Sequence, residues 1–418
     1  MKPTKIGILH YSAPPVIGGV EAVIFAHARV FVEAGYPVTV IAGRGEQSAL
    51  PPGVEFVGIP ILDTQHPQIL AASAELEAGR VPEDFSKLVD EILQFLDPLL
   101  AEFDNLIVHN VLGKHFNLPL TAALFQLMDS GVIQHCISWG HDFTWTSPRS
   151  RSKVHPGYPW DMLRTYRQDV TYVAVSEKRA RELAGLLKTS EEKIHVVYNG
   201  VDPKTLLGLS EQGFALIERL DLFKADLVML MPVRVTQAKN IEFALRVTAA
   251  LKESGLRCRL VLTGPPDPHD DQNMRYFNQL RDLRRELDVE DEMRFVYESG
   301  PQQEQGFTIG IEVVGDLYRV CDLMFMPSHR EGYGMPVLEA GLVGVPVFST
   351  SVVPAAQEIG GEDVILYDLD EKPLSVAKRI RQLLENDPIY HMRCRVRRKY
   401  TWRSLFRARI EPLLKKKA

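Results

Sequence analysis

The chain has 418 residues, of which 45% are hydrophobic and 24% are charged, and its formal net charge is −6. A chain of this length is too long for one ordinary core, so we expect two domains of roughly 200 residues each. The negative charge argues against a general nucleic-acid-binding protein. No apolar run reaches the roughly 18 residues that a membrane-spanning helix needs.

The N-terminal segment and the cysteines indicate a compartment. The segment MKPTKIGILHYS leads directly into a predicted strand, and its apolar part is too short for a signal peptide. The cysteines are far apart and lack metal-site spacing: Cys136, Cys258, Cys321 and Cys394. Three of them lie in or beside apolar runs, which indicates buried free thiols in a reducing compartment. We therefore expect a cytoplasmic protein.

Short β-branched runs alternate with helical periods along the first half of the chain. This pattern is typical of a parallel sheet covered by helices on both faces. The predicted strands are 5–10, 38–42, 54–59, 105–110, 135–140, 171–176 and 194–199, and the predicted helices are 19–34, 84–101 and 177–187. An irregular polar stretch at 200–225 predicts a hinge.

The second half of the chain repeats the alternation. Strands are predicted at 227–234, 258–264, 293–298, 323–328, 345–349 and 364–368, and helices at 239–254, 272–287, 336–342 and 373–385. Residues 300–311 predict an exposed loop. The fold class is therefore α/β, with two doubly wound parallel sheets, and ligands in such sheets bind at the carboxyl ends of the strands.

Residues 322–350 combine an apolar strand with two glutamates, Glu331 and Glu339. Pro336 fits the first turn of a helix, where its missing N–H costs nothing. The free amides around Gly334–Leu338 then form an anion site with a carboxylate on either side. Such amides can bind phosphate and such carboxylates can bind hydroxyls, so the arrangement suits a sugar diphosphate. For the glutamates alone, the simpler interpretation is a pair of solvated acids on an ordinary turn.

The string SHREGYGMPVLEAGLVGVPV resembles the signature of retaining glycosyltransferases of family four, which have the GT-B fold. The resemblance implies two Rossmann-like domains facing across a cleft. We expect an acceptor-side domain at 1–205 and a donor-binding domain at 206–399. It also implies that a helix at 400–418 packs back on the first domain. A surface helix with a basic face and contact with a membrane surface are the alternatives for that segment.

Two further strings match the same family. Gly18 and Gly19 open a helix after the first strand, in the GGVE string that family four typically shows, and they let backbone approach a phosphate. Arg234 and Lys239 lie between a strand and a helix, and in the family such a pair neutralises the diphosphate. Taken alone, the glycines and the cations could equally be turn and surface residues.

Polar residues at other strand ends complete the candidate site. The resemblance places His141 facing the donor sugar, and Asp142 either fixes a histidine tautomer or binds acceptor. His109 and Asn110 are predicted sugar-side or acceptor contacts, and Tyr297 is a predicted contact of the nucleotide base. A histidine that merely caps its turn is the alternative for His141.

The resemblance implies a retaining hexosyltransferase. Such an enzyme moves a hexose from a donor of the UDP-glucose or GDP-mannose type to an acceptor hydroxyl. His141, Glu331, Arg234 and Lys239 are the candidate catalytic residues, with Glu331 on the hexose and Glu339 on the ribose. The donor-binding set is Gly18, Gly19, Gly334, Met335, Pro336, Val337, Glu339 and Tyr297. A sugar-nucleotide epimerase on the same scaffold is the alternative, and an oxidoreductase lacks its G-x-G-x-x-G motif.

We expect no cofactor and no essential metal, because arginine and lysine supply the cations. The D-x-D at Asp368–Leu369–Asp370 is predicted to be a turn between a strand and a helix. The segment 143–160 follows His141 and carries four basic residues (Arg149, Arg151, Lys153 and His155) and several aromatic residues. It predicts either an acceptor site, with a sugar stacked on Trp145 or Trp160, or a solvated basic loop.

Overall fold

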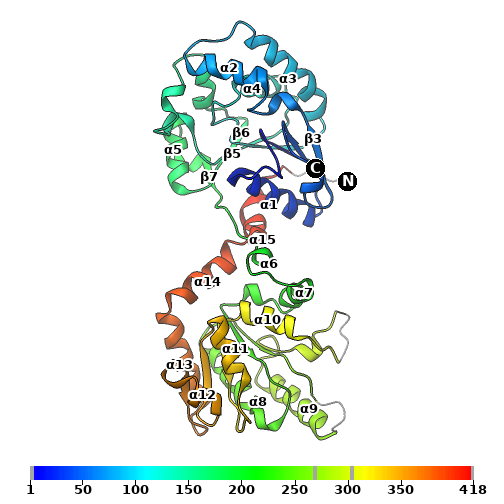
Figure 1. Ribbon diagram of the computed structural model, residues 1–418, viewed down its shortest axis with the longest axis vertical. Helices are drawn as coiled ribbons and strands as arrows, with labels where there is room; N and C mark the ends of the chain where they lie inside the picture. Colours follow the sequence, from blue (N-terminus) through cyan, green and yellow to red (C-terminus); the bar gives the residue numbers. More distant parts are fainter. Residues whose placement is uncertain (1–3, 267–270, 302–305, 416–418) are drawn as a thin grey trace. The chain divides into compact units, whose positions relative to one another are not determined.

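The computed structural model describes residues 4–266, 271–301 and 306–415 (Figure 1). It divides into two compact units. The first runs to Gly200 and includes the chain from Trp402 onward, and the second spans Val201–Thr401. The divisions therefore lie at 200/201 and 401/402, where the sequence predicted 205/206 and 399/400.

The first unit is built on a parallel seven-stranded sheet in the order β3-β2-β1-β4-β5-β6-β7. The strands are β1 (Ile6–Leu9), β2 (Val38–Ala42), β3 (Val54–Gly58), β4 (Asn105–His109), β5 (Cys136–Gly140), β6 (Val170–Ala174) and β7 (Ile194–Val196). The central strands β1, β2, β4 and β5 are buried along their whole length, which explains their continuous apolar runs.

Helices cover both faces of this sheet. They are α1 (Gly19–Glu33), α2 (Pro67–Glu77), α3 (Phe85–Leu100), α4 (Leu118–Asp129) and α5 (Glu177–Leu187). Apolar side chains of α2, α3, α4 and α5 form one core cluster with the sheet, and those of α1 form a second. This layering is the doubly wound arrangement of a Rossmann-like fold.

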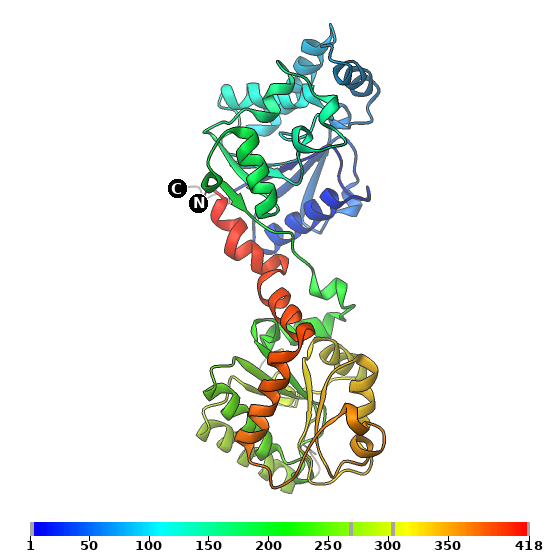
Figure 2. The same ribbon diagram turned by 90° about the vertical axis from the view of Figure 1, so that its left-hand side faces the viewer.

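The C-terminal segment belongs to the first unit. After α15 (Trp402–Leu405), a π-helical turn and a 3-10 turn carry the chain to Leu413. Trp402, Phe406 and Ile410 are buried in the same cluster as α1. Arg403 and Tyr36 add hydrogen bonds to Glu33 and Glu411, at 2.9 Å each. The red ribbon of this segment lies against α1 in Figures 1 and 2.

The second unit is a parallel six-stranded sheet in the order β10-β9-β8-β11-β12-β13. Its strands are β8 (Leu227–Met231), β9 (Cys258–Leu262), β10 (Met293–Phe295), β11 (Leu323–Met326), β12 (Val347–Thr350) and β13 (Ile365–Tyr367). Its helices are α6 (Pro203–Leu206), α7 (Glu211–Arg219), α8 (Ile241–Glu253), α9 (Asp271–Glu286), α10 (Ile311–Val320), α11 (Met335–Val343), α12 (Pro354–Glu358), α13 (Pro373–Asn386) and α14 (Pro388–Lys399). Helices α8, α9 and α13 form one core cluster with the sheet, and α7, α10, α11 and α12 form another.

The strand predictions are confirmed, and the division at 200/201 falls at the start of the stretch that was predicted as a hinge, but that stretch is not irregular. Residues 200–225 contain α6 and α7, which begin after the capping side chains of Asp202 and Ser210. The buried Leu216 and Ile217 hold α7 against the sheet. Four residues of the predicted loop at 300–311, 302–305, lie outside the described residues. The helix predicted at 400–418 is not one regular α-helix either, because α15 gives way to the π-helical turn after Leu405 and to the 3-10 turn after Ile410.

The cysteine prediction is confirmed, since Cys136, Cys258 and Cys321 are buried free thiols and Cys394 is a half-buried one. Burial raises the pKa of Cys136 and Cys258 to about 12. Both thiols are therefore protonated and unreactive at neutral pH.

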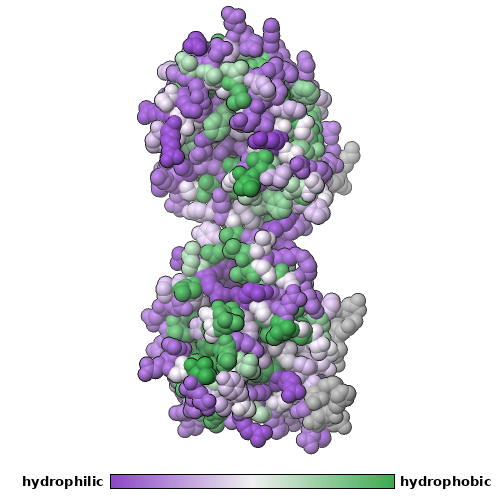
Figure 3. Space-filling view, viewed as in Figure 1, coloured by the Kyte–Doolittle hydropathy of each residue, from purple (hydrophilic) through white to green (hydrophobic). Residues whose placement is uncertain are grey.

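Apolar side chains are also present on the surface of the second unit. Figure 3 shows hydrophobic residues gathered on its front face, where Figure 1 places α11. On this helix Met335, Leu342 and Val343 are exposed. Across the described part of the chain, no helix is long and apolar enough to span a membrane.

Candidate functional site

In the second unit, two loops at the carboxyl ends of neighbouring strands are tied together. The loop after β8 contacts the loop after β11, because the amide of His329 donates to the carbonyl of Ala238 at 2.8 Å. The hydroxyl of Thr350, at the end of β12, donates to the carbonyl of Ser328 at 2.7 Å. The sheet order makes this contact possible, since β8, β11 and β12 are adjacent.

Glu331 and Lys239 meet across these loops. Lys239 Nζ lies 2.5 Å from Glu331 Oε1, and the hydroxyl of Ser328 donates to the same oxygen at 2.8 Å. The side chains of Lys239 and Glu331 are 19% and 10% exposed, so the pair is partly shielded from water. The second carboxylate oxygen, Oε2, has no hydrogen-bond or ion-pair partner among the described residues and is available to a ligand.

Arg234 stands in the same loop as Lys239 but differs in its partners. Its neighbours Val233 and Val235 are buried, whereas the Arg234 side chain is exposed and has no ion pair within the described ranges. The loop after β9 approaches closely, since a Cβ on Gly264 would lie 2.5 Å from the carbonyl oxygen of Val233. Arg234 is thus a guanidinium available to an anion, and it shares its loop with a lysine that a carboxylate holds.

The N-terminus of α11 begins at Gly334, which has a φ of 106° that side chains rarely adopt. A Cβ there would also lie 2.6 Å from Val353 Cγ1, so the position needs glycine. Met335 and Pro336 are the first two helical residues, and the amide of Val337 already donates to the carbonyl of Gly334 at 2.9 Å.

Glu339 lies one turn into α11. Its Oε2 accepts from the hydroxyl of Tyr318 at 2.9 Å. Burial and the Glu339 carboxylate raise the pKa of Tyr318, so the phenol stays a donor. Glu339 is therefore fixed by one hydrogen bond at the end of the sheet that also holds Glu331.

Tyr297 is separated from this group. It lies in the turn after β10, an edge strand, with its ring edge against Phe277 at a centroid distance of 5.6 Å. The sheet order puts β9 and β8 between β10 and β11. The structure thus brings Lys239 and Glu331 into contact. It puts Arg234 in the same loop as Lys239, while Tyr297 stands apart.

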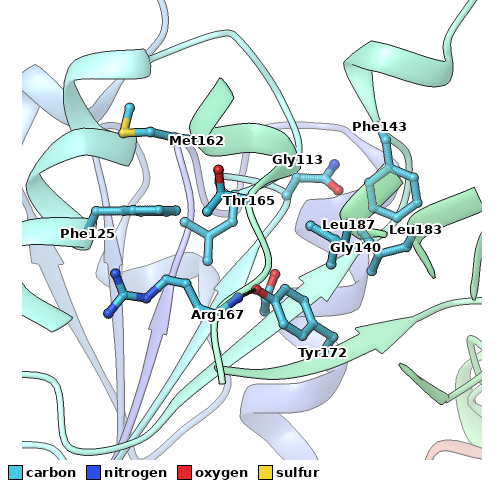
Figure 4. A pocket seen from close by; sticks show the side chains of 13 residues that line it. Gly113, Phe125, Gly140, Phe143, Met162, Thr165, Arg167, Tyr172, Leu183 and Leu187 are labelled. Atoms are coloured by element: carbon cyan, nitrogen blue, oxygen red, sulfur yellow. Dashed lines mark hydrogen bonds between the residues drawn. The ribbon is translucent and has the colours of Figure 1, made fainter. Parts of the chain in front are cut away.

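In the first unit, His141 follows β5 and is held by the end of β4. The amide of His141 donates to Asn110 Oδ1 at 2.9 Å, and His141 Nε2 lies 3.1 Å from His109 Nδ1. The Phe143 ring packs against the same segment. A Cβ on Gly140 would lie 2.6 Å from the Phe143 ring and one on Gly113 would lie 3.0 Å from it, which shows how closely the ring packs (Figure 4).

Asp142 pairs with Lys114 instead of with a histidine. Asp142 Oδ1 lies 3.1 Å from Lys114 Nζ, and the lysine side chain is only 7% exposed. Of the two roles predicted for Asp142, fixing a histidine tautomer is therefore contradicted, since His109 contacts the ring of His141. Contact with an acceptor stays a prediction.

Four histidine side chains cluster around the ends of β4 and β5: His10, His27, His109 and His141. His27 and His109 are fully buried, with ring centroids 5.3 Å apart, and His27 packs on Trp139 at 4.5 Å. Burial lowers the pKa of His27 to about 3 and that of His141 to about 4. Burial also takes the pKa of His109 well below its usual range. At neutral pH these rings are uncharged.

This burial predicts that acid destabilises the first unit. An unfolded imidazole titrates near pH 6.5, whereas His27 stays neutral to about pH 3, so unfolding takes up a proton between these values. Between pH 7.5 and 5.5, His27 alone should lower the free energy of unfolding by about 1.4 kcal/mol. His27→Leu should reduce the loss by that amount. Urea titrations followed by tryptophan fluorescence report on this unit, because all four tryptophans lie in it. An equal loss in the variant would contradict the prediction.

Gly18 is the N-cap of α1, and the carboxylate of Glu21 folds back over it. A Cβ on Gly18 would lie 2.0 Å from Glu21 Oε2, and Ser12 Oγ donates to Glu21 Oε1 at 2.6 Å. A carboxylate at this position stabilises a helix N-terminus, as a bound anion would. Phosphate contact at Gly18 and Gly19 stays a prediction, and a phosphate there would share the helix end with an acid.

The two glycines should respond differently to alanine. Gly18→Ala displaces Glu21 from Ser12 and should cost about 1–2 kcal/mol of stability, the range for a lost buried hydrogen bond. A Cβ on Gly19 meets nothing within 4 Å, so Gly19→Ala should leave stability unchanged or raised. Urea melts followed by tryptophan fluorescence compare the two. Equal destabilisation by both variants would show that loss of the Ser12–Glu21 hydrogen bond is not the reason why Gly18→Ala is less stable.

The segment 143–160 gives little support to a stacking site. Trp160 is buried, and the guanidinium of Arg164 covers the Trp145 ring at 4.0 Å. Lys153 pairs with Glu77 at 3.0 Å. The nearby cavity in Figure 4 has a volume of about 10 Å³, room for about one water molecule. Sugar stacking on Trp160 is therefore wrong for this structure, and Trp145 would first have to release Arg164.

Asp368–Leu369–Asp370 is a turn at the end of β13, with Ser351 Oγ donating to Asp368 Oδ1 at 3.1 Å. Within the described ranges, no group of three or more histidine, cysteine or acidic side chains could hold a metal ion.

Comparison with known proteins gives two matches to family models. The model described as Glycosyltransferase Family 4 matches residues 17–205, and Glycosyl transferases group 1 matches 215–399. Together they cover both units. The chain belongs to this glycosyltransferase family. Its two parallel, doubly wound sheets are accordingly the Rossmann-like domains of the GT-B fold.

Several relatives from this family align with the chain. An uncharacterized glycosyltransferase of Methanocaldococcus jannaschii is 26% identical over 54% of this chain and 53% of its own length. A D-inositol 3-phosphate glycosyltransferase of Actinosynnema mirum is 33% identical over 43% of this chain and 40% of its own length. The chain thus spans about half the length of these relatives. A solved glycosyltransferase from Rickettsia africae aligns with a TM-score of 0.38 at 16% identity, covering 99% of this chain and 98% of the other.

Some partners of the site residues were not predicted. Ser328 lies in the signature string itself, three residues before Glu331, and a hydroxyl at that spacing could have been read as its partner. Tyr318 lies in α10, a helix that the sequence analysis did not predict. Lys114 follows the predicted His109–Asn110 pair by a few residues, but no pattern marked it as a buried cation.

Proposed function

We propose that the protein is a retaining hexosyltransferase that uses a nucleotide-diphosphate sugar. The observation that carries the proposal is the group at the end of β8 and β11, where a lysine–carboxylate pair shares the loop after β8 with an exposed arginine, Arg234. A cation pair suits a diphosphate and a carboxylate suits sugar hydroxyls. Membership of the glycosyltransferase family supports the same chemistry.

In the proposed reaction, the bond between the anomeric carbon and the diphosphate breaks as an acceptor hydroxyl attacks from the same face. Negative charge grows on the leaving phosphate, and Arg234 and Lys239 would stabilise it. The amides at the start of α11 and beside Gly18–Gly19 would contribute in the same way. Glu331 would accept hydrogen bonds from hexose hydroxyls, Glu339 would hold the ribose diol, and Tyr297 would contact the base.

His141 of the first unit would donate a hydrogen bond to the donor sugar and orient its ring. Because burial lowers its pKa to about 4, it would act as a neutral imidazole and not as a general acid at pH 7. We also propose that the reaction needs no divalent metal and that the protein acts in the cytoplasm, where free buried thiols persist.

Product analysis tests this proposal. The protein is incubated with a panel of nucleotide sugars, including UDP-glucose and GDP-mannose, and with sugar, sugar-phosphate and polyol acceptors, with and without EDTA. We expect nucleoside diphosphate release, an acceptor glycoside with the donor's anomeric configuration by proton NMR, and no effect of EDTA. An inverted anomer would refute retention, and an altered sugar nucleotide formed without acceptor would identify an epimerase.

A further inference from the structure

The end of β4 supports His141 through two consecutive residues. β4 and β5 are neighbours, with His109 opposite Trp139 in register. From this position the His109 ring reaches the His141 ring at 3.1 Å, while the Asn110 side chain accepts from the His141 amide at 2.9 Å. One residue therefore holds the ring and the next holds the backbone.

Asn110 can do this because of its backbone conformation. Its φ of 59° is left-handed, a region that asparagine tolerates better than most residues. The turn points the Asn110 side chain toward the next strand, while the Asn110 amide donates to the carbonyl of Trp139 at 2.9 Å. The side chain is nearly buried, at 9% exposure, and the contact is thus shielded from water.

The contact between the two rings fixes a tautomer, because neutral imidazoles share one proton between them. His109 Nε2 is buried and has no hydrogen-bond partner among the described residues, and neither has the neighbouring Trp139 Nε1. If His109 carried its proton on Nε2, that buried N–H donor would be unpaired, as the Trp139 N–H already is. A proton on His109 Nδ1 is instead used in the contact with His141 and leaves only a lone pair on Nε2, which is the more favourable arrangement.

We propose that His109 and Asn110 are positioning residues for His141, with His109 donating from Nδ1 to His141 Nε2. His141 then carries its own proton on Nδ1, which has no hydrogen-bond partner among the described residues, and this N–H is directed to a ligand oxygen. This inference rests on the proposed function and revises one prediction made from the sequence. His109 was expected to contact substrate, but its ring is fully buried and acts through His141.

Nitrogen-15 NMR of the ligand-free protein, labelled at histidine, tests the tautomers without any variant. We expect a pyrrole-type resonance for His109 Nδ1 and His141 Nδ1, a pyridine-type resonance for His141 Nε2, and a coupling across the His109–His141 hydrogen bond. A pyrrole-type His141 Nε2, or no coupling, would overturn the proposal. Because no substrate is present, this result is independent of whether the protein transfers a sugar.

Activity of matched variants tests the positioning role, with the nucleotide sugar that the product analysis identifies. Asparagine places an amide N–H near the position of imidazole Nδ1, so His109→Asn should retain at least a third of kcat, whereas His109→Leu should lower it at least 10-fold. Asn110→Asp keeps the side-chain oxygen that accepts from the His141 amide, so kcat should fall less than 5-fold. Asn110→Gly keeps the left-handed turn but removes this oxygen, so kcat should fall at least 5-fold.

Two comparisons separate positioning from a loss of folding. His135 is also buried and hydrogen-bonded through both ring nitrogens, to Asn105 at 2.8 Å and Thr171 at 3.0 Å, but it precedes β5. His135→Leu should therefore leave kcat within 2-fold. His109→Leu should have no further effect in a His141→Ala background. An equal loss in that background, or in His135→Leu, would show a merely structural role.

Discussion

Glu331→Gln is expected to lower kcat/KM for the nucleotide sugar about 100-fold, or about 2.7 kcal/mol. The charged carboxylate accepts from Lys239 and Ser328 through one oxygen and keeps the other for the ligand. Hydrogen bonds to charged groups contribute about 1.5–3 kcal/mol each, and glutamine offers one neutral acceptor in their place. The variant also leaves Lys239 without its carboxylate, so the lysine is no longer held beside the diphosphate position. Steady-state kinetics with varied donor concentration measure the loss.

Glu371 provides a matched control for this variant. It accepts from the hydroxyl of Ser375 at 2.8 Å and pairs with Arg379 at 2.9 Å, the same types of partner that hold Glu331. Its side chain is 21% exposed, and it lies between β13 and α13; β12 separates β13 from β11 in the sheet. Glu371→Gln should leave kcat/KM within 2-fold. Equal losses of kcat/KM in the two variants would show that Glu331 does not contact the donor.

Arg397→Leu is expected to cost about 3–5 kcal/mol of stability in the second unit, the usual penalty for breaking a buried ion pair. The Arg397 guanidinium pairs with Asp322 through both nitrogens, at 3.0 and 2.9 Å. It also donates to the carbonyls of Ala225 and Asp226 at 3.1 and 3.0 Å. The variant would leave Asp322, which is 4% exposed, as an uncompensated charge at the start of β11.

Hydrogen exchange of peptides from β8 and β11 measures this loss, because the second unit has no tryptophan. Arg395→Leu is the control, since Arg395 is exposed on the same helix and has no hydrogen bond or ion pair in the described part of the chain. We expect the free energy of opening, derived from the exchange rates of this variant, to stay within about 0.5 kcal/mol of the value for the original protein. Comparable acceleration of hydrogen exchange in both variants would show that the ion pair of Arg397 with Asp322 is not what stabilises the second unit.

The architecture followed from sequence because buried parallel strands have a plain signature. Runs such as LVMLM and VTVIA are apolar at every position, since both faces of the sheet are covered. The helices were harder to predict. In 200–225 the polar residues that indicated a hinge, such as Asp202 and Ser210, turned out to be helix caps. A capping residue and a loop residue look alike until the apolar face of the helix is recognised.

The candidate site was predictable only in part. Lys239 and Glu331 are far apart in sequence, and their resemblance to a known signature predicted one site before the structure showed them in contact at 2.5 Å. The role of His109 was not predictable, because a polar residue at a strand end is as easily a ligand contact as a support. Only the complete burial of its ring and its 3.1 Å contact with His141 distinguish the two.

Direct titration of nucleotide sugars tests the central claim, that the ends of β8 and β11 hold a sugar diphosphate. Isothermal titration calorimetry compares UDP-glucose, GDP-mannose, UDP and GDP on the original protein, on Arg234→Ala and on Arg395→Ala. We predict that at least one of the four ligands binds the original protein. The same ligand should bind Arg234→Ala at least 10-fold more weakly and should bind Arg395→Ala with unchanged affinity. Absence of binding by all four, or equal affinity for Arg234→Ala and the original protein, would contradict the account.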